Sequence, residues 1–389
     1  MKTSWIRLKP KEDKRIMAGH SWVFSNEIAG IEGTPAVGEI VGVKSSAGKS
    51  LGFGFYNPKT LISVRIFSRE NEEVNDSFFV RRIQSALELR NRLFNAPFYR
   101  LVYGESDFLP GLIIDRFGDL FSVQTLSAAM DMRMGSIVQS INELFAPAAI
   151  YERNESPTRE LEGLEKRKSI LCGESRSSDY DEEGVTFRIN PYEGQKTGFY
   201  FDQRLNRVFS RKFAGGSKVL DLFSNEGGFA LNLARGGAED VIAVESSHLA
   251  VDAMMVNAQL NSLANVKAET RDVDDFLSSA ISKGEVFDCV VCDPPSFTRN
   301  RKSVTAAKVG YRRLHEKLFA VLRPHGILLT SSCSHHIFRE TFEEIIAEAA
   351  GRTGRTLQLL NRAGASPDHP VIPLMPETEY LKFAAYRVA

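Results

Sequence analysis

Two residues at the ends of apolar segments could together perform covalent chemistry. Cys333 ends the buried run 326–333, and Asp293 follows directly after the apolar segment 287–292. The two prolines after Asp293 fix the backbone and remove two amide donors, so we expect a rigid turn. Because the carboxyl ends of parallel strands meet at one edge of a sheet, the thiol and the carboxylate are predicted to lie close together. Cys333 is therefore a candidate nucleophile, the alternative being a small buried residue.

The stretch before these residues alternates strand, glycine turn, helix, strand and acid. Residues 219–223 and 241–244 are short apolar runs typical of buried strands. Gly227 and Gly228 lie between them and would let the backbone approach a ligand closely. Glu245 at the end of the second run suits the two hydroxyl groups of a ribose. This order indicates the first half of a doubly wound nucleotide-binding domain, the alternative being a purely structural turn.

The charges of this glycine turn argue against a bound pyrophosphate. No G-x-G-x-x-G is present, and Glu226 stands where a phosphate needs bare amides. Asp221 near the tip of the first strand instead suits a cationic ligand, such as the amino acid end of S-adenosylmethionine. Asp272, which follows a third strand at 266–270, or its neighbouring amide could meet an adenine edge.

Composition limits the class of protein. With 389 residues, 43% hydrophobic and 25% charged, we expect two or three soluble domains. The N-terminus lacks a signal peptide's apolar core, no apolar run approaches the ~20 residues that span a bilayer, and four cysteines are too few for a disulfide framework. A cytoplasmic enzyme is the expectation. Cys289 and Cys292 have C-x-x-C spacing without a second ligand pair, so no metal is expected.

Turn signals divide the chain into three predicted parts. Residues 1–73 hold short apolar pieces between Gly, Pro, Ser and Asn, which favours a small barrel. Residues 76–185 are interpreted as a compact α+β unit that ends in a polar, acidic loop. Residues 190–389 contain the α/β alternation. The expected fold class is thus multidomain α/β.

Charge is uneven although the net charge is zero. The first hundred residues hold 16 Lys and Arg against 10 Asp and Glu, a weak hint of phosphate contact against the alternative of an ordinary solvated surface. Two groups of residues could contact RNA: a basic and aromatic set in the barrel, and a basic loop after Asp293. The first set is Lys9, Lys11, Lys14, Arg15, His20 and Trp22, and the second is Arg299, Arg301, Lys302, Lys308, Arg312 and Arg313. Residues 194–204 are interpreted as a flap over the cofactor, with a domain-joining hairpin as the alternative.

The motifs at 293–297 (DPPSF) and 332–334 (SCS), with Asp221 and Glu245, resemble those of the class I S-adenosylmethionine-dependent RNA methyltransferases. Over nearly the whole chain the closer resemblance is to the bacterial 23S ribosomal RNA cytosine-C5 methyltransferases that carry an N-terminal PUA domain. The matching motifs are WVFS at 22–25, GESD at 104–107, LPG at 109–111, KTG at 196–198, DQR at 202–204, GGF at 227–229 and ASPDHPV at 365–371.

The resemblance implies an N-terminal PUA-like RNA-binding barrel and a C-terminal Rossmann-like methyltransferase sheet. It implies that the Cys333 thiolate adds to C6 of an unstacked cytosine while Asp293 holds the base near N3. RNA, either 23S rRNA or a ribosomal precursor, is the implied partner, and a homodimer is left open. The implied S-adenosylmethionine-binding residues are Lys196, Gln203, Asp221, Phe223, Gly227, Gly228, Phe229, Glu245, Ser246, Asp272 and Asp293.

The sequence departs from the family pattern in three places. Ser296 stands where lysine is frequent and cannot serve as a second thiol, and Asn225 with Glu226 replaces Tyr-Thr. His335 and His336 replace smaller residues and could help deprotonate Cys333, although loop histidines more often have no such role.

Two other functions stay open on the sequence. Turns of this kind also hold exocyclic amines of adenine or guanine, and methylation of an amine needs no cysteine. The second open function is that of a non-catalytic RNA-binding protein in ribosome assembly. The presence of all four site residues argues against it: Asp221, Glu245, Asp293 and Cys333.

Overall fold

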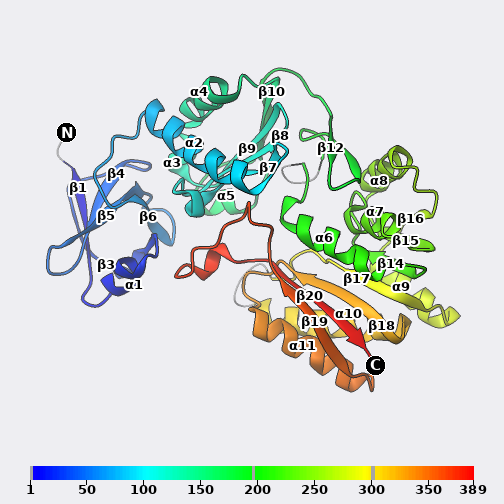
Figure 1. Ribbon diagram of the computed structural model, residues 1–389. Coiled ribbons are helices and arrows are strands. Elements are labelled where there is room, and N and C mark those ends of the chain that lie inside the picture. The colour runs from blue at the N-terminus through cyan, green and yellow to red at the C-terminus, as the bar shows by residue number, and fades with distance from the viewer. Residues whose placement is uncertain (1–2, 195–197, 299–302) are drawn as a thin grey trace. The chain divides into compact units, whose positions relative to one another are not determined.

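The computed structural model describes residues 3–194, 198–298 and 303–389, so Lys196 and the predicted contacts Arg299, Arg301 and Lys302 lie outside the described residues. The chain forms two compact units, and Figure 1 follows it in colour from the N-terminus to the C-terminus. The first unit contains Met1–Ser178, Ile189–Phe201 and Pro367–Thr378. The second contains Asp179–Arg188, Asp202–Ser366 and Glu379–Ala389.

The first unit begins with a six-stranded sheet in the order β2-β6-β5-β4-β1-β3. The pair β1 and β4 is parallel, and the other pairs are antiparallel. Short apolar strands between turn residues bury one core, which includes Ile6, Val23, Val41 and Val64. The small barrel predicted at the N-terminus is therefore confirmed. Its elements are β1 (Ser4–Leu8), α1 (Asp13–Ala18), β2 (Trp22–Phe24), β3 (Ile28–Glu32), β4 (Ile40–Lys44), β5 (Ser50–Tyr56) and β6 (Ile62–Ser68).

A five-stranded sheet in the order β11-β10-β9-β8-β7 completes the first unit. Helix α2 covers it, and its start is fixed because the Asn75 side chain accepts a hydrogen bond from the backbone N–H of Phe78. Phe79, Ile83 and Ala86 then turn one face of α2 toward the core. The elements are α2 (Asp76–Leu93), β7 (Phe98–Tyr103), β8 (Leu112–Phe117), β9 (Leu120–Thr125), α3 (Ala128–Asp131), α4 (Met134–Phe145), β10 (Ala149–Asn154), α5 (Thr158–Leu161) and β11 (Arg167–Cys172).

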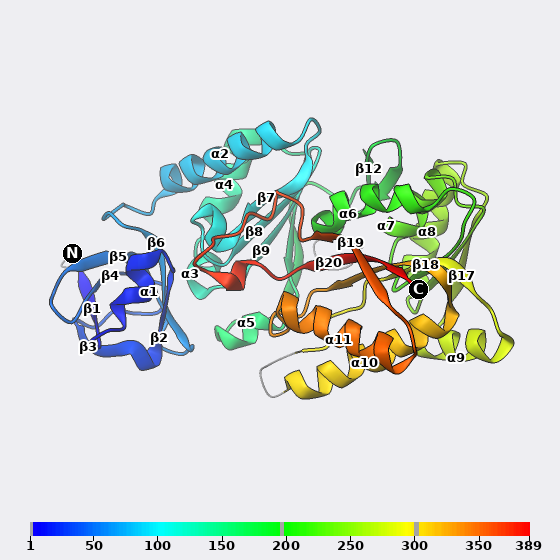
Figure 2. The same ribbon diagram turned by 60° about the horizontal axis from the view of Figure 1, so that its bottom comes forward.

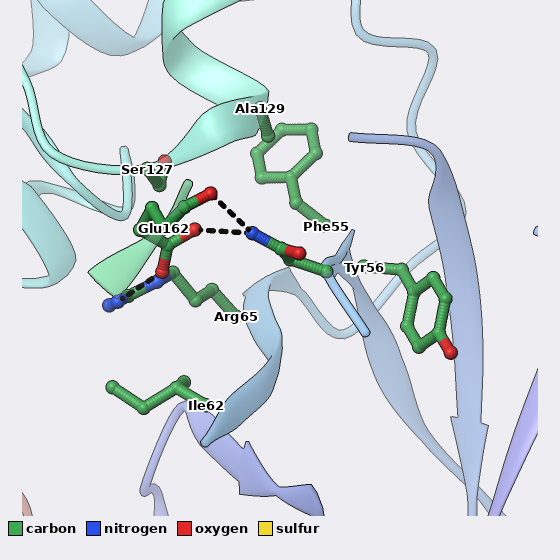
Figure 3. Close-up of a pocket in the computed structure, with 8 residues that line it drawn as sticks. Phe55, Tyr56, Ile62, Arg65, Ser127, Ala129 and Glu162 are labelled. Carbon is green, nitrogen blue, oxygen red and sulfur yellow. Dashed lines mark hydrogen bonds and ion pairs between the residues drawn. The ribbon is translucent and has the colours of Figure 1, made fainter. Parts of the chain in front are cut away.

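An arginine with a side chain only 14% exposed joins the six-stranded sheet to the five-stranded part of the same unit. Arg65 of β6 donates to Glu105 Oε1 at 2.8 Å and to Glu162 Oε1 at 2.9 Å. Glu162 also accepts from Asn57 Nδ2 at 2.9 Å. Figure 3 shows the Glu162 carboxylate facing the Arg65 side chain. The two acids hold the pKa of Arg65 above its usual range although burial opposes this. The cluster is thus a charge-compensated contact inside the first unit.

The second unit is built on a seven-stranded sheet in the order β16-β15-β14-β17-β18-β20-β19. The first five strands are parallel, and β20 runs antiparallel to β18 and β19. Helices α6, α7 and α8 cover one face, and α9, α10 and α11 cover the other (Figures 1 and 2). This confirms the predicted Rossmann-like sheet.

The elements of the second unit agree closely with the predicted alternation, and the expected third strand at 266–270 has the same bounds as β16. The ribbon β12 (Ser178–Asp181) and β13 (Thr186–Ile189) precedes them. The helices are α6 (Arg204–Ser210), α7 (Gly228–Arg235), α8 (His248–Leu260), α9 (Val273–Lys283), α10 (Val304–Val321) and α11 (Arg339–Arg352), and the strands are β14 (Lys218–Leu222), β15 (Asp240–Glu245), β16 (Val266–Thr270), β17 (Phe287–Cys292), β18 (Leu322–Ser332), β19 (Leu357–Ala363) and β20 (Lys382–Val388). The domain boundaries predicted at 1–73, 76–185 and 190–389 stay predictions.

The Arg65 cluster gives a stability prediction. Replacing Arg65 by Met should lower the free energy of unfolding of the first unit by about 3–5 kcal/mol, because Glu105 and Glu162 are left in a buried site without their cation. Urea unfolding followed by tryptophan fluorescence measures this, since Trp22 also donates to Glu105.

The matched control is Arg7→Met on the same sheet. Its partner is Glu32, and both side chains are about half exposed at 49% and 46%. We expect a much smaller loss there, because exposed ion pairs contribute little. Equal losses for Arg65→Met and Arg7→Met would contradict the assignment of Arg65 as a buried, stabilising cation.

Candidate active site

The register of the parallel strands brings four strand ends to one edge of the sheet. Leu222 of β14 pairs with Val244 of β15 on one side and with Cys292 of β17 on the other. Cys292 in turn pairs with Thr330 of β18. The residues that follow these strands therefore share the carboxyl edge, where ligands of such sheets bind. They are Phe223, Asp293 and Cys333, and Glu245, the last residue of β15, lies at the same edge.

The structure brings the cysteine and the Asp-Pro-Pro turn together, as expected from the sequence. Cys333 lies directly after β18, is half-buried, and its Sγ lies 3.9 Å from the carbonyl oxygen of Pro294. The backbone N–H of Phe297 donates to Ser334 Oγ at 3.1 Å, and Ser296 Oγ lies 3.2 Å from the same hydroxyl. These bonds fix the turn that carries Asp293 against the segment that carries the thiol.

A hydroxyl network behind the cysteine was not predicted. Tyr311 of α10 places its hydroxyl 2.9 Å from Ser332 Oγ and 3.0 Å from Ser334 Oγ, on either side of Cys333. Its ring stacks on Phe297 with centroids 4.4 Å apart. Burial raises the pKa of Tyr311 to about 12, so the phenol stays neutral at pH 7. The tyrosine thus positions the cysteine segment as a neutral hydrogen-bonding group.

A buried lysine adjoins the same segment and was also missed from the sequence. Lys382 begins β20 and pairs across the antiparallel ladder with Ser332. Its Nζ donates to the carbonyl oxygens of Ser334 and Tyr380, both at 2.7 Å, and the residue is only 4% exposed. Burial lowers the pKa of Lys382 to about 8. The available signal was a single lysine inside the otherwise apolar run 381–386.

The glycine turn after β14 has an unusual backbone. Phe223 and Asn225 have φ of 59° and 50°, and Gly227 has φ of 84°. Left-handed conformations in residues with side chains are costly and cluster at ligand sites. Glu245 supports the turn because its Oε2 accepts the backbone N–H of Asn225 at 3.1 Å, while its Oε1 accepts that of Ser247 at 2.9 Å. The turn is therefore held in a shape suited to close contact with a ligand.

Two carboxyl groups at this turn, Asp221 at the end of β14 and Glu226, have pKa values close to neutral pH. Asp221 is 1% exposed and accepts hydrogen bonds at Oδ2 from Ser224 Oγ and from the backbone N–H of Ala230. Burial raises its pKa to about 7, and the nearby Asp293 and Glu245 add to the effect. Burial likewise raises the pKa of Glu226 to about 7. A cation bound here would stabilise the charged form of these carboxyls.

The glycines and Phe229 have packing roles that the sequence did not reveal. A Cβ on Gly227 would lie 2.6 Å from Met254 Cγ, and one on Gly228 would lie 2.8 Å from Arg207 Cδ. Phe229 is buried, and its ring lies parallel to Phe383 with centroids 6.3 Å apart. Glycine is therefore needed at both positions for helix packing as well as for the turn.

Other predicted cofactor residues already have partners within the protein. Gln203 donates to Ser331 Oγ at 3.0 Å and accepts from Asn206 Nδ2 at 2.6 Å. Asp272 is exposed and caps α9, because its Oδ1 accepts the backbone N–H groups of Asp274 and Asp275. Ser246 Oγ donates to Glu245 at 3.2 Å. Contacts of these side chains with a cofactor stay predictions.

The remaining predicted residues are placed as follows. Cys289 and Cys292 are fully buried on β17, and burial raises the pKa of both thiols. Within the described residues, no group of three or more His, Cys, Asp or Glu could hold a metal ion. The ring of His335 lies 5.6 Å from that of Tyr380.

No helix among the described residues is long and apolar enough to cross a membrane.

The comparisons with known proteins agree with this geometry. A model of the S-adenosylmethionine-dependent methyltransferase family matches residues 166–383, which is more than half of the chain. The chain belongs to this methyltransferase family. A model of the PUA-like domain matches residues 6–69, which include all six strands of the N-terminal sheet except the first residues of β1.

Curated relatives match over almost the full length of this methyltransferase. The ribosomal RNA large subunit methyltransferase I of Klebsiella pneumoniae (strain 342) is 37% identical over 384 residues, covering 97% of this chain and 96% of that protein. The protein of the same name from Tolumonas auensis is 36% identical over 386 residues, covering 97% of each chain.

Solved structures show the same fold. A methyltransferase in complex with SAH has a TM-score of 0.86 at 21% identity and matches 100% of both chains. A protein from Streptococcus mutans described as a SAM-dependent methyltransferase has a TM-score of 0.85 at 20% identity and covers 98% of this chain and 99% of its own.

The family establishes S-adenosylmethionine as the cofactor, and the residues at the carboxyl edge fit it. Asp221 and Glu226 are carboxyls that a cationic amino acid or sulfonium group would stabilise in their charged form. Glu245 lies at the tip of the neighbouring strand, where an acid suits a ribose diol.

Replacing Asp221 should raise the stability of the protein and weaken its binding of the cofactor. Its pKa in the folded protein is about 7 against 3.8 normally, so its ionisation costs the folded state stability as the pH rises through that window. Asp221→Asn should stabilise the cofactor-free protein by roughly 2–4 kcal/mol at pH 8, with the difference vanishing toward pH 4. The same variant should bind S-adenosylmethionine at least about tenfold more weakly, because a neutral amide cannot attract a cation.

Thermal unfolding at several pH values and titration calorimetry measure the two effects. Asp274→Asn on the exposed start of α9 is the control and should change neither. Unchanged cofactor affinity in Asp221→Asn would remove Asp221 from the cofactor site.

Proposed function

We propose that this methyltransferase forms 5-methylcytosine in large-subunit ribosomal RNA through a covalent adduct of Cys333. The observation that carries the proposal is the contact of Cys333 Sγ with Pro294 O, which puts a thiol beside the turn that carries Asp293. The curated relatives are named ribosomal RNA large subunit methyltransferase I, and a PUA-like domain precedes the methyltransferase sheet. Both facts favour an RNA substrate.

The chemistry requires a nucleophile because C5 of cytosine is a poor one. The Cys333 thiolate forms a bond to C6, and the electron pair of the C5–C6 double bond makes C5 nucleophilic. S-adenosylmethionine supplies an electrophilic methyl group. C5 would take the methyl group as its bond to the sulfonium sulfur breaks, which leaves S-adenosylhomocysteine. A base then removes the C5 proton, and the C6–S bond breaks to return the thiolate. The net change is replacement of one C5 hydrogen by methyl with release of one proton.

Asp293 would hold the base during this sequence. It follows β17 directly, and the two prolines after it restrict the backbone of the turn. Its carboxyl can hydrogen-bond the N3 and N4 edge of cytosine, which gains electron density when the thiolate adds at C6. Such placement on a rigid turn costs little reorganisation during the reaction.

RNA would be contacted partly by the N-terminal barrel. Of the basic and aromatic set predicted there, Arg15 pairs with Glu27, while His20 and Trp22 bond Glu377 and Glu105. Lys9, Lys11 and Lys14 are exposed and remain suited to phosphate contact. The basic loop predicted after Asp293 is wrong for its described part, because Lys308, Arg312 and Arg313 lie on helix α10. Arg312 pairs with Glu348, and Lys308 and Arg313 are exposed candidate contacts.

An alternative function is methylation of an exocyclic amine of adenine or guanine. The Asp-Pro-Pro-x-Phe turn favours it, since a carboxylate on a rigid turn can also accept hydrogen bonds from an amino group, and that reaction needs no thiol. A non-catalytic role in ribosome assembly would leave the side chains at the carboxyl edge without a task.

Cys333→Ala separates these functions. The protein and its variant are incubated with labelled S-adenosylmethionine and with RNA or large ribosomal subunits from a strain lacking the gene, and nucleosides are resolved by mass spectrometry. We expect label in 5-methylcytidine and a loss of at least about a thousandfold in the variant. Cys172→Ala, which removes a half-buried thiol of β11, is the matched control and should retain activity.

Two results would contradict the proposal. Label in a methylated amine, or activity that survives Cys333→Ala, would favour the amine methyltransferase. Absence of any transfer together with retained RNA binding would favour the non-catalytic function.

A further inference from the structure

Lys382 is a buried cation that forms no ion pair with a carboxylate of the described residues. Its Nζ contacts two neutral carbonyl oxygens, those of Ser334 and Tyr380. Among the residues that the structure describes, no carboxylate lies within ion-pairing distance of this nitrogen. Burying an ammonium in this way is costly, so buried lysines are as a rule paired with an anion. The ammonium has three N–H donors, and the two carbonyl oxygens use only two of them.

The segment beside Lys382 contains a group that can become an anion. Lys382 lies opposite Ser332 in the ladder and bonds the carbonyl of Ser334, so its ammonium adjoins the two neighbours of Cys333. The charges of Cys333 and Lys382 interact, and a thiolate there favours the protonated lysine. The attraction is mutual, because any interaction that stabilises the ammonium beside a thiolate also stabilises the thiolate.

The other ionisable groups around the pair do not replace this interaction. Arg339 at the start of α11 disfavours the charged lysine, and Glu379 favours it, so their effects are opposed. Tyr311 from α10 faces the thiol as a neutral phenol. Asp293 and the buried Cys292 lie on the β17 side, where Asp293 disfavours further negative charge. Among the residues that the structure describes, Lys382 is thus a cation placed to stabilise a thiolate within the protein core.

We propose that Lys382 is a positioning residue that holds Cys333 as a thiolate before the RNA base arrives. The inference rests on the proposed function, in which Cys333 is the nucleophile. The two carbonyl bonds fix the ammonium, and the thiol proton passes to solvent when the ion pair forms. A thiolate next to lysine reacts faster at neutral pH than an ordinary thiol.

The test measures the thiol directly and needs no RNA. The full-length protein is alkylated with iodoacetamide at pH values from about 5.5 to 9.5, and mass spectrometry of the Cys333 peptide gives the rate at each pH. Lys382→Met should move the midpoint of this profile up by at least about one pH unit and slow alkylation at pH 7 about tenfold. Lys382→Arg keeps the charge and should restore most of the rate.

Lys218→Met is the matched control. Lys218 begins β14 at the opposite end of the same sheet, and its Nζ lies over the Phe287 ring, so the variant removes equal charge far from the thiol. Its profile should coincide with that of the unmodified protein. A Lys382→Met profile that also coincides would overturn the proposal, as would a Lys382→Arg variant as slow as Lys382→Met.

A reciprocal measurement serves if Lys382→Met does not fold. In protein carrying 13C-labelled lysine, the Lys382 Cε signal reports the protonation of its amine. Cys333→Ser removes the anion, and the titration of Lys382 should move to lower pH; an unmoved titration overturns the pair.

The outcomes also separate this inference from the proposed function. If Cys333→Ala abolishes methylation but Lys382→Met leaves the alkylation profile unchanged, the nucleophile stands and the ion pair fails. If the profile shifts but Cys333→Ala still methylates RNA, the ion pair stands and the proposed chemistry fails.

Discussion

The parallel register of β15, β14, β17 and β18 is the constraint on which the site depends. Each strand contributes its last residue or the residue that follows it, so the edge residues meet only if the four strands keep this register. A shift of one residue in β18 would turn each of its side chains to the opposite face of the sheet and separate Cys333 from the turn after β17. The apolar core on one face of the sheet fixes that register, because Leu222, Val290 and Leu328 lie on that face and are all fully buried.

Burial at this edge drives ionisable groups toward neutrality. The pKa values of Asp221 and Glu226 rise to about 7, while that of Lys382 falls to about 8. The protonation of these groups therefore changes most easily near neutral pH, where a bound cation or anion can decide it. Burying these ionisable groups lowers the stability of the folded protein, but it lets a bound ligand set their charge. Active sites often lose stability in this way for the sake of function.

The sequence predicted what is local and missed what is not. Apolar runs between turn residues predicted the strands, and the acid and cysteine that follow them could be found because a strand end is visible in the sequence. Tyr311 of α10 and Lys382 of β20 bond the residues next to Cys333, and no local pattern shows that β20 pairs with β18. Asp272 follows its strand as predicted, yet its Oδ1 caps α9, because an acid between strand and helix serves either purpose. Arg15 and Trp22 were likewise predicted to contact RNA, although both form hydrogen bonds with acidic residues within the first unit.

The departure at Ser296 limits how the proposed adduct could be resolved. Its hydroxyl donates to the carbonyl of Thr298 and lies beside Ser334 Oγ, so it belongs to the hydrogen bonds that hold the turn. Cys292 is the thiol next to the turn, but it is fully buried and burial raises its pKa, so it is a poor acid–base group. If Cys333 forms the bond to C6, removal of the C5 proton then falls to an oxygen or nitrogen base or to water, and not to a second thiolate. The edge therefore offers the proposed chemistry one thiol, whose neighbours Ser332 and Ser334 are bonded by a neutral tyrosine and a buried lysine.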